Sequence, residues 1–278
     1  MAETKALKVD IDKVLRDKAG AKAKYVPRFV VNWLKRIVHQ DGLNDFLAQH
    51  QGEEGTVWLR SVIEYLDVKL EVRGLENLPL ASGAPCTFVS NHPLGGIDGV
   101  ALGMILGEHY DNNIRYLLND ILMNLPGLRP LGVAVNVTGA QDRDIFAKVN
   151  EVFRSNHHVI VFPAQLCSRL IDGKVQDLPW KKTVVQKSIQ TQRDIVPIHF
   201  SGQNSRRFYR IANFSKAIGL KFNLAMLFLS DEVFRSRGRS FVVSIGKPIP
   251  WQTFDKSRTH TEWAQWLRQQ VYDLSGVQ

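Results

Sequence analysis

The sequence predicts an α/β fold: a mixed, largely parallel sheet covered by helices, preceded by an N-terminal helical region. From about residue 68, short β-rich runs alternate with helical segments, which is typical of largely parallel or mixed sheets. The first 67 residues instead carry helical periodicity. With 278 residues, 44% of them hydrophobic, the chain is long enough for one large α/β domain with an appendage. We therefore expect a helical region over 1–67 and an α/β domain over 68–278.

The N-terminal region contains four helical segments, at 8–23, 25–40, 43–50 and 56–66. In the second, Pro27 stands at a position suited to a helix start. The same segment has an apolar stripe of Phe29, Val30, Trp33, Leu34 and Val38.

The α/β domain is expected to alternate strands with helices. Seven β-rich runs are predicted as strands, at 68–74, 86–90, 114–118, 132–137, 158–164, 195–200 and 240–246. Five helical segments accompany them, at 98–110, 141–155, 180–192, 205–218 and 260–274. In open sheets of this class the active groups lie at the carboxyl ends of strands, on loops that lead into helices.

The net charge of +9 favours an anionic partner, such as a nucleic acid, an anionic membrane surface, or an acidic carrier or substrate. The first forty residues hold ten Lys and Arg against four Asp and Glu. This basic segment suits an anionic leaflet, into which Phe29, Val30 and Trp33 would insert shallowly. The alternative is that the apolar stripe packs on the main domain. No RNA-binding signature with interleaved aromatics is present, so we expect no nucleic-acid partner.

Other sequence features restrict the protein class. The charged first forty residues lack the apolar centre of a secretory signal, and the longest apolar runs are far shorter than the roughly 20 residues that a bilayer requires. If the protein meets a membrane, we therefore expect it to lie on the surface. Cys86 and Cys167 suggest buried filler in a reduced setting, and His157 and His158 suggest surface or capping groups. No G-x-S-x-G elbow, P-loop or metal-ligand spacing occurs, so no metal is expected.

The stretch TFVSNHPLGGIDGVALG places His92 directly after a predicted strand and Asp98 at the start of a predicted helix. A carboxylate that accepts the proton of one imidazole nitrogen fixes the tautomer and makes the other nitrogen a general base. Gly95 and Gly96 would let the backbone fold back so that the two side chains meet. On spacing alone a second reading stays open, in which Asp98 is a helix cap and His92 a turn residue. A base without its own nucleophile indicates that the substrate supplies a hydroxyl.

Several short motifs occur along the chain in the order in which they occur in a known enzyme superfamily. SNHPLGGIDG resembles the first motif of the lysophospholipid acyltransferase (PlsC-like) superfamily, and its five residues between His and Asp resemble the bacterial hemolysin-like branch, which includes ornithine-lipid and glycine-lipid O-acyltransferases. GVAVNVTGAQ, VFPAQLCSRLIDGKVQDLPWKK, IVPIHFSGQNSRRFY and SIGKPIPW resemble the later motifs. The resemblance covers residues 70–255 and implies a glycerophosphate-acyltransferase-like fold and an O-acyltransferase activity. One departure is Ala164-Gln165, where the superfamily has Glu-Gly. If that glycine has a positive φ, Gln165 strains the turn or reshapes the loop.

The resemblance implies roles for individual residues. His92 would take the proton of the acceptor hydroxyl, and Asp98 would orient His92. Arg169 would bind the acceptor's phosphate or carboxylate with its planar fork. The residues expected around the substrate are Asn91, Gly95, Gly96, Asn136, Phe162, Pro163, Arg169 and Lys181.

The resemblance also implies partners. The donor would be a fatty acyl thioester of acyl carrier protein or coenzyme A, with no further cofactor. The acceptor would be a membrane lyso-lipid, of lyso-ornithine or N-acylglycine type, at the cytoplasmic face of the inner membrane. Two alternatives remain: a 1-acylglycerol-3-phosphate acyltransferase of phospholipid synthesis, and a non-catalytic basic membrane-binding protein on an acyltransferase scaffold.

Overall fold

The computed structural model describes residues 8–135, 143–217 and 227–276. Its main sheet has seven strands in the order β1-β9-β8-β2-β5-β3-β4, and every neighbouring pair is parallel except β8 with β9. The predicted mixed, largely parallel sheet is confirmed, as is each of its strands. Their bounds are β1 Lys69–Arg73, β2 Thr87–Ser90, β3 Ile114–Asn119, β4 Gly132–Val135, β5 His158–Val161, β8 Ile195–Phe200 and β9 Ser240–Ile245.

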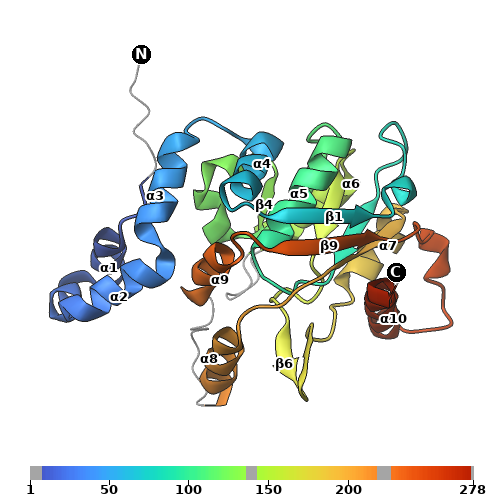
Figure 1. Cartoon of the computed structure of the whole chain (residues 1–278). Coiled ribbons are helices and arrows are strands. Elements are labelled where there is room, and N and C mark those ends of the chain that lie inside the picture. Colours follow the sequence, from blue (N-terminus) through green and yellow to red (C-terminus); the bar gives the residue numbers. More distant parts are fainter. Residues whose placement is uncertain (1–7, 136–142, 218–226, 277–278) are drawn as a thin grey trace.

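Helices cover the sheet, and the described part of the N-terminal region is helical (Figure 1). The α-helices are α1 Ile11–Ala19, α2 Arg28–Val38, α3 Gln40–Gln49, α4 Gly55–Tyr65, α5 Ile97–His109, α6 Arg143–Arg154, α7 Thr183–Thr191, α8 Arg206–Ala217, α9 Leu229–Arg235 and α10 His260–Asp273. The short 3-10 helices are η1 Gly20–Tyr25, η2 Leu75–Asn77, η3 Asp120–Asn124, η4 Pro126–Leu128, η6 Trp251–Thr253 and η7 Leu274–Gly276. All nine predicted helical segments contain a helix.

A small hairpin and a short α-helix lie outside the segments predicted from the sequence. The strands β6 (Arg169–Ile171) and β7 (Lys174–Gln176) form an antiparallel hairpin outside the main sheet. Each has three residues, which is too short for an alternating pattern to be recognised. The turn between them, Asp172-Gly173, has positive φ at both positions, and an Asp-Gly pair is a hairpin signal. The other element is α9, which has only seven residues.

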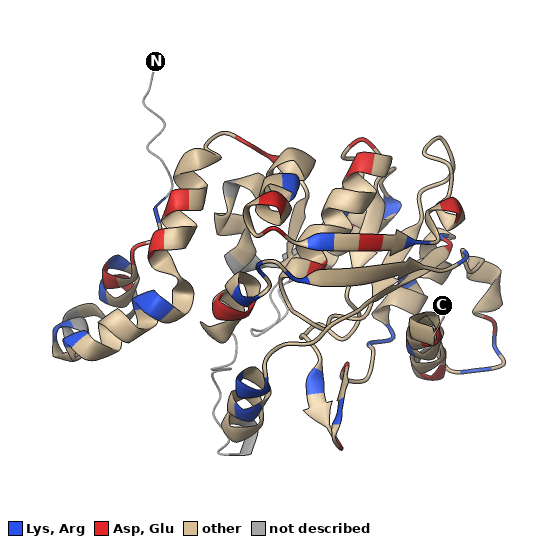
Figure 2. Cartoon of the chain, in the orientation of Figure 1, with Lys and Arg blue, Asp and Glu red and all other residues tan. Residues whose placement is uncertain are grey.

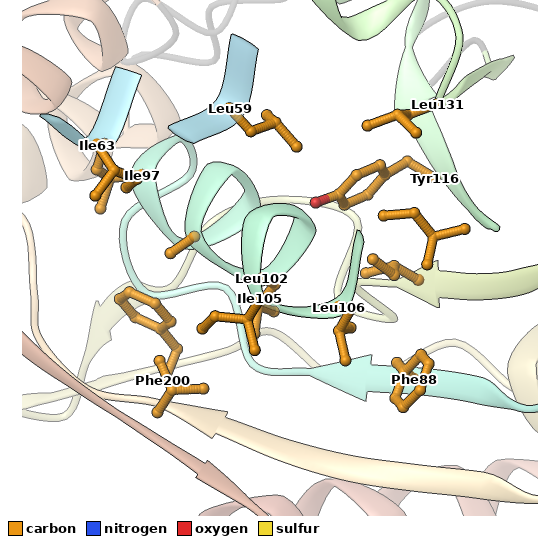
Figure 3. Close-up of a cluster of buried hydrophobic side chains, with 14 of the residues drawn as sticks. Leu59, Ile63, Phe88, Ile97, Leu102, Ile105, Leu106, Tyr116, Leu131 and Phe200 are labelled. Carbon is orange, nitrogen blue, oxygen red and sulfur yellow. The ribbon is translucent and has the colours of Figure 1, made fainter. Parts of the chain in front are cut away.

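The main core lies between the sheet and α5, which is apolar on nearly all sides and carries the buried Leu102, Ile105 and Leu106 (Figure 3). Leu59 and Ile63 of α4 pack into the same cluster. Because α4 precedes residue 68, the helical part of the sequence also contributes to the core of the α/β domain. The boundary at residue 67 stays a prediction.

The N-terminal helix α2 is divided between core and solvent. Val31 and Ile37 are buried, whereas Phe29 is 75% exposed and Trp33 is 42% exposed. The junction of α2 and α3 is attached to α9 through His39. Its Nε2 lies 2.8 Å from Oδ1 of Asp231, and its ring stacks on Phe234 at 4.4 Å between centroids. Among the described residues, no helix combines the length and hydropathy that crossing a bilayer requires.

Candidate active site

The candidate site lies on the loop between β2 and α5, at the carboxyl end of a strand in the middle of the sheet. Asn91 fixes the start of this loop, because its side-chain amide donates to the Phe200 carbonyl oxygen and its Oδ1 accepts from the Phe200 N–H, at 2.9 and 2.7 Å. Asn204 holds the middle of the loop with a hydrogen bond to the Leu94 carbonyl oxygen. The Asn91 side chain is thus engaged with β8, and the loop is held at a defined position above the sheet.

The predicted meeting of His92 and Asp98 is confirmed. Nδ1 of His92 lies 3.0 Å from Oδ2 of Asp98. The Asp98 side chain has no exposed surface, while the His92 side chain is 17% exposed. An ionised carboxylate only accepts hydrogen bonds, so Nδ1 carries the proton of the neutral ring. Nε2, which has no hydrogen-bond partner among the described residues, is then the basic atom.

Asp98 lies in the first turn of α5, whose N-cap is Gly96, so the reading of Asp98 as the helix cap is wrong. Its Oδ2 accepts from the N–H groups of Leu94 and Gly95, and its Oδ1 accepts from those of Gly96 and Gly99, at 2.9 to 3.2 Å. A negative charge at the first turn of a helix is favoured by the helix dipole. These hydrogen bonds fix the position of the carboxylate, which in turn fixes the orientation of the His92 ring.

The two glycines are required by backbone conformation and by space. Gly95 has a φ of +76°, a backbone conformation that residues other than glycine rarely adopt. A Cβ at Gly95 would lie 2.9 Å from both Cys167 and Leu229, and a Cβ at Gly96 would lie 2.5 Å from Val233. Leu229 and Val233 belong to α9, so this unpredicted helix packs directly on the loop that carries His92.

Phe162, one of the residues predicted around the substrate, lies against His92, and Pro163 follows it as a buried residue. The Phe162 ring stacks on the imidazole with 4.1 Å between centroids and 25° between planes. The following turn has a hydrogen bond from the Gln165 N–H to the Phe162 carbonyl oxygen. Gln165 is exposed and has a φ of +64°, so this turn has the positive φ that suits a glycine. The strain expected at Gln165 is present.

Arg169 is near enough to His92 to affect its pKa. One terminal nitrogen of the guanidinium, Nη1, donates to the carbonyl oxygens of Cys167 and Ser168, at 2.5 and 3.3 Å, and the group lies over the Phe208 ring. These contacts fix the guanidinium, while the other terminal nitrogen, Nη2, has no partner among the described residues. Arg169 can therefore receive an anion close to the base.

The pKa values of the pair move apart. Burial disfavours the charged form of His92, but the Asp98 carboxylate outweighs it, so the pKa of His92 lies above its usual 6.5. Burial would raise the pKa of Asp98, but His92 and the backbone N–H groups outweigh it, so this pKa lies below its usual 3.8. Asp98 is thus ionised throughout the range in which His92 titrates.

Sequence reasoning missed Asp177, a buried carboxylate that touches the loop. Its Oδ1 accepts from the His92 N–H at 3.2 Å and from the Ser168 hydroxyl at 2.6 Å. The Ser168 N–H in turn donates to the His92 carbonyl oxygen at 2.7 Å. Because 85 residues separate His92 from Asp177, no local spacing relates them; the only signal was an acidic residue inside the third motif region.

The remaining predicted residues are placed differently. Lys181 is exposed, and its N–H donates to the Pro163 carbonyl oxygen. Asn136 lies outside the described residues.

Both cysteines are buried and free, as expected. His158 corrects our expectation of a surface group: it is 1% exposed, its Nδ1 accepts from the Cys86 N–H, and burial lowers its pKa to about 4.

The arrangement suits proton abstraction from a bound hydroxyl. It has a base with its tautomer fixed, a buried carboxylate behind it and a cation beside it. The described residues contain no group of three or more His, Cys, Asp or Glu side chains that could hold a metal ion.

Comparison with known proteins gives a consistent result. The sequence model of the family described as "Acyltransferase" matches residues 13–277. A lyso-glycine lipid O-acyltransferase of Phocaeicola vulgatus is 56% identical over 274 residues, covering 99% of this chain and 98% of the relative. One from Bacteroides thetaiotaomicron is 53% identical, covering 99% and 100%. Among solved structures, the 1-acyl-sn-glycerophosphate acyltransferase PlsC of Thermotoga maritima matches with a TM-score of 0.49 and 17% identity, covering 96% of each chain.

The family match spans nearly the whole chain, and both relatives are more than half identical to it over nearly their full length. The resemblance carried by the motifs is therefore confirmed at the level of the family. The chain belongs to the acyltransferase family and is an enzyme of that class.

Proposed function

We propose that the protein transfers a fatty acyl group from an acyl thioester to the free hydroxyl of a lyso-glycine lipid, with His92 as general base and Asp98 as its orienting partner. The observation that carries the proposal is the His92–Asp98 pair at the carboxyl end of β2, in a chain similar to two proteins that are both named for this acceptor. The acceptor is an N-(3-hydroxyacyl)glycine, which offers one hydroxyl and one carboxylate.

In the proposed reaction, Nε2 of His92 takes the proton of the acceptor hydroxyl as its oxygen attacks the thioester carbonyl carbon. The new C–O bond forms and, as the tetrahedral intermediate collapses, the C–S bond breaks. The leaving thiolate takes the proton from Nε2, which returns His92 to its neutral form. Asp98 stabilises the imidazolium while it exists, because its charge lies 3.0 Å from Nδ1.

Arg169 is the proposed partner of the acceptor carboxylate. Its guanidinium is already held by the Cys167 and Ser168 carbonyl groups, so little conformational entropy is lost when an anion binds. The shared chemistry of a glycine carboxylate and a glycerol phosphate means that Arg169 alone does not separate the two acceptors. The names of the two relatives favour the glycine lipid.

The proposed setting is the cytoplasmic face of the inner membrane. There a peripheral enzyme could reach either candidate acceptor, the glycine lipid or the glycerophosphate lipid. Phe29 and Trp33 of α2 are exposed beside basic residues, which is the composition of an interfacial helix. Helix α8 adds a second basic surface: Arg206, Arg207 and Arg210 are exposed, and the helix has no acidic residue (Figure 2). Its exposed Phe214 supplies an apolar side chain at the same surface.

The proposal is tested with purified protein and a panel of defined substrates. The donors are palmitoyl thioesters of coenzyme A and of acyl carrier protein. The acceptors are N-(3-hydroxyacyl)glycine, lyso-ornithine lipid and 1-acylglycerol-3-phosphate. We expect an ester product with the glycine lipid, detected by mass spectrometry.

A His92→Ala variant that retains the thermal unfolding of the parent is the control, and we expect its rate to fall by about 10²–10⁴-fold. Product from the glycerophosphate acceptor alone would replace the proposed acceptor. Product formed equally by the His92→Ala variant would remove the mechanism.

A further inference from the structure

The residues around Asp177 form a buried polar cluster that the base-and-partner scheme does not use. Asp177 is 2% exposed and lies just after β7, and Ser168 is 1% exposed and lies just before β6. The carboxylate therefore stands at the foot of the β6–β7 hairpin, where the hairpin meets the loop that carries His92.

Every contact of the Asp177 carboxylate is with a hydrogen-bond donor. Oδ1 accepts from the His92 N–H and the Ser168 hydroxyl, and Oδ2 accepts from the Trp180 indole N–H at 2.8 Å. Two of these partners, the His92 N–H and the Trp180 indole, can only donate, which suits an ionised carboxylate. A buried negative charge is therefore held next to the main chain of the general base.

The same residue is fixed from its other side by α10. The Asp177 N–H donates to the Tyr272 hydroxyl at 2.8 Å, and Arg268 donates to the Asp177 carbonyl oxygen at 3.0 Å. A second bond from Arg268 reaches the Gln176 side chain. The C-terminal helix is thus joined to the His92 loop through one aspartate.

We propose that Asp177 is a positioning residue for the acyl transfer, which holds the His92 main chain and keeps a second carboxylate behind the base while Asp98 holds the ring. The inference rests on the proposed function of His92. It adds a contact between the third motif region, the C-terminal helix and the catalytic loop. Asp177 touches no reacting atom and acts through His92.

The charged groups around His92 determine in which direction its pKa changes when Asp177 is replaced. The groups that act on His92 are Asp98 from α5, Asp177 from the end of the hairpin and Arg169 from β6; both carboxylates raise the pKa of His92 and the arginine lowers it. Removing the Asp177 charge therefore lowers the pKa of His92. Burial raises the pKa of Asp177 itself, and the Ser168 hydroxyl opposes that rise.

The first test is an Asp177→Asn variant beside a matched Asp172→Asn control. Asp172 is exposed at the tip of the same hairpin, with a φ of +50° that asparagine also tolerates. We expect Asp177→Asn to lower kcat by about 10- to 100-fold with a small change in KM, because misplacement of a base by a fraction of an ångström costs rate. Its His92 ring, followed by NMR with labelled histidine, should titrate at lower pH than in the parent and the control.

The Ser168→Ala variant is the second test and keeps the Asp177 charge. It removes one of the donors that hold the carboxylate, so we expect kcat to fall by less than in Asp177→Asn, while His92 keeps its raised pKa where Asp177 is ionised. This variant decides the question if Asp177→Asn does not fold. Parental kcat and parental His92 titration in the folded variants would overturn the proposal.

The NMR readout separates this inference from the proposed reaction. A lowered His92 pKa in Asp177→Asn, together with an active His92→Ala enzyme, would support the contact and reject the base mechanism. An inactive His92→Ala enzyme together with an unaltered His92 titration in Asp177→Asn would reject the contact and support the base.

Discussion

Gly96 and Val233 are in such close contact that a Cβ on residue 96 would lie 2.5 Å from Cγ2 of Val233. Gly96 belongs to the loop that carries His92, and Val233 belongs to α9. The same helix bears Asp231, which binds His39 at the junction of α2 and α3. Helix α9 therefore contacts the loop that carries His92 on one side and the N-terminal helices on the other.

A Gly96→Ala substitution should lower acyl transfer by at least tenfold, because the added methyl group pushes the loop away from α9 and shifts His92. A Val233→Ala substitution alone should destabilise the fold by about 1–2 kcal/mol, since Val233 is partly buried against the core. The double variant Gly96→Ala/Val233→Ala should recover part of the lost rate. Kinetics of all four proteins test this, and a double variant no better than Gly96→Ala would show that space at Val233 is not the cause.

The rate of acyl transfer should fall as the pH falls through the raised pKa of His92. The proposed reaction requires neutral His92, and the Asp98 carboxylate holds the pKa of the imidazole above 6.5. The acid limb of kcat/KM should therefore have its midpoint above pH 6.5. An Asp98→Asn variant should move this midpoint down and lower the rate by about 10²-fold or more, because the tautomer is no longer fixed. A midpoint below pH 6.5 in the parent would contradict the assignment.

The same pKa shift predicts a pH dependence of stability. The folded pKa of His92 is above the unfolded one, so its contribution to the free energy of unfolding is fully present below about pH 6.5 and is lost as the pH rises through the folded value. Urea unfolding of the parent and His92→Gln at several pH values measures the difference. The stability gap between them should narrow from acid to alkaline pH, and a gap that widens would have the wrong sign.

The sequence predicted the features that have a local residue pattern or belong to a short motif. Seven β-rich runs became the seven strands, and the glycines between His92 and Asp98 indicated their meeting, because short-range chain folding controls both. Residues joined only by tertiary structure were not found. Asp177 contacts His92 from 85 residues away in the sequence. The packing of α9 against Gly95 and Gly96 is likewise visible only in the three-dimensional structure.

Gln165 provides a test of the turn beside the site. It has a φ of +64°, which is costly for a residue with a side chain, and costs most for a β-branched one. Gln165→Gly should leave the free energy of unfolding within about 1 kcal/mol of the parent and keep the activity, because glycine adopts this conformation freely. Gln165→Val should destabilise by about 1–2 kcal/mol. Equal stability of the two variants, measured by urea unfolding, would mean that the turn relaxes to negative φ.

Helix α8 provides the test of the membrane surface. Arg206 and Arg210 are exposed, and each basic side chain near an anionic leaflet contributes about 1 kcal/mol of binding free energy. Arg206→Ala/Arg210→Ala should therefore weaken binding to vesicles that contain phosphatidylglycerol by about 30-fold, an effect that added salt reduces. The matched control is Lys247→Ala/Lys256→Ala, which removes the same charge from two exposed positions beyond the carboxyl end of β9. Co-sedimentation measures both variants. An equal loss in both would assign the binding to net charge, whereas a loss confined to the α8 variant would assign it to this helix, because only the position of the removed charges differs.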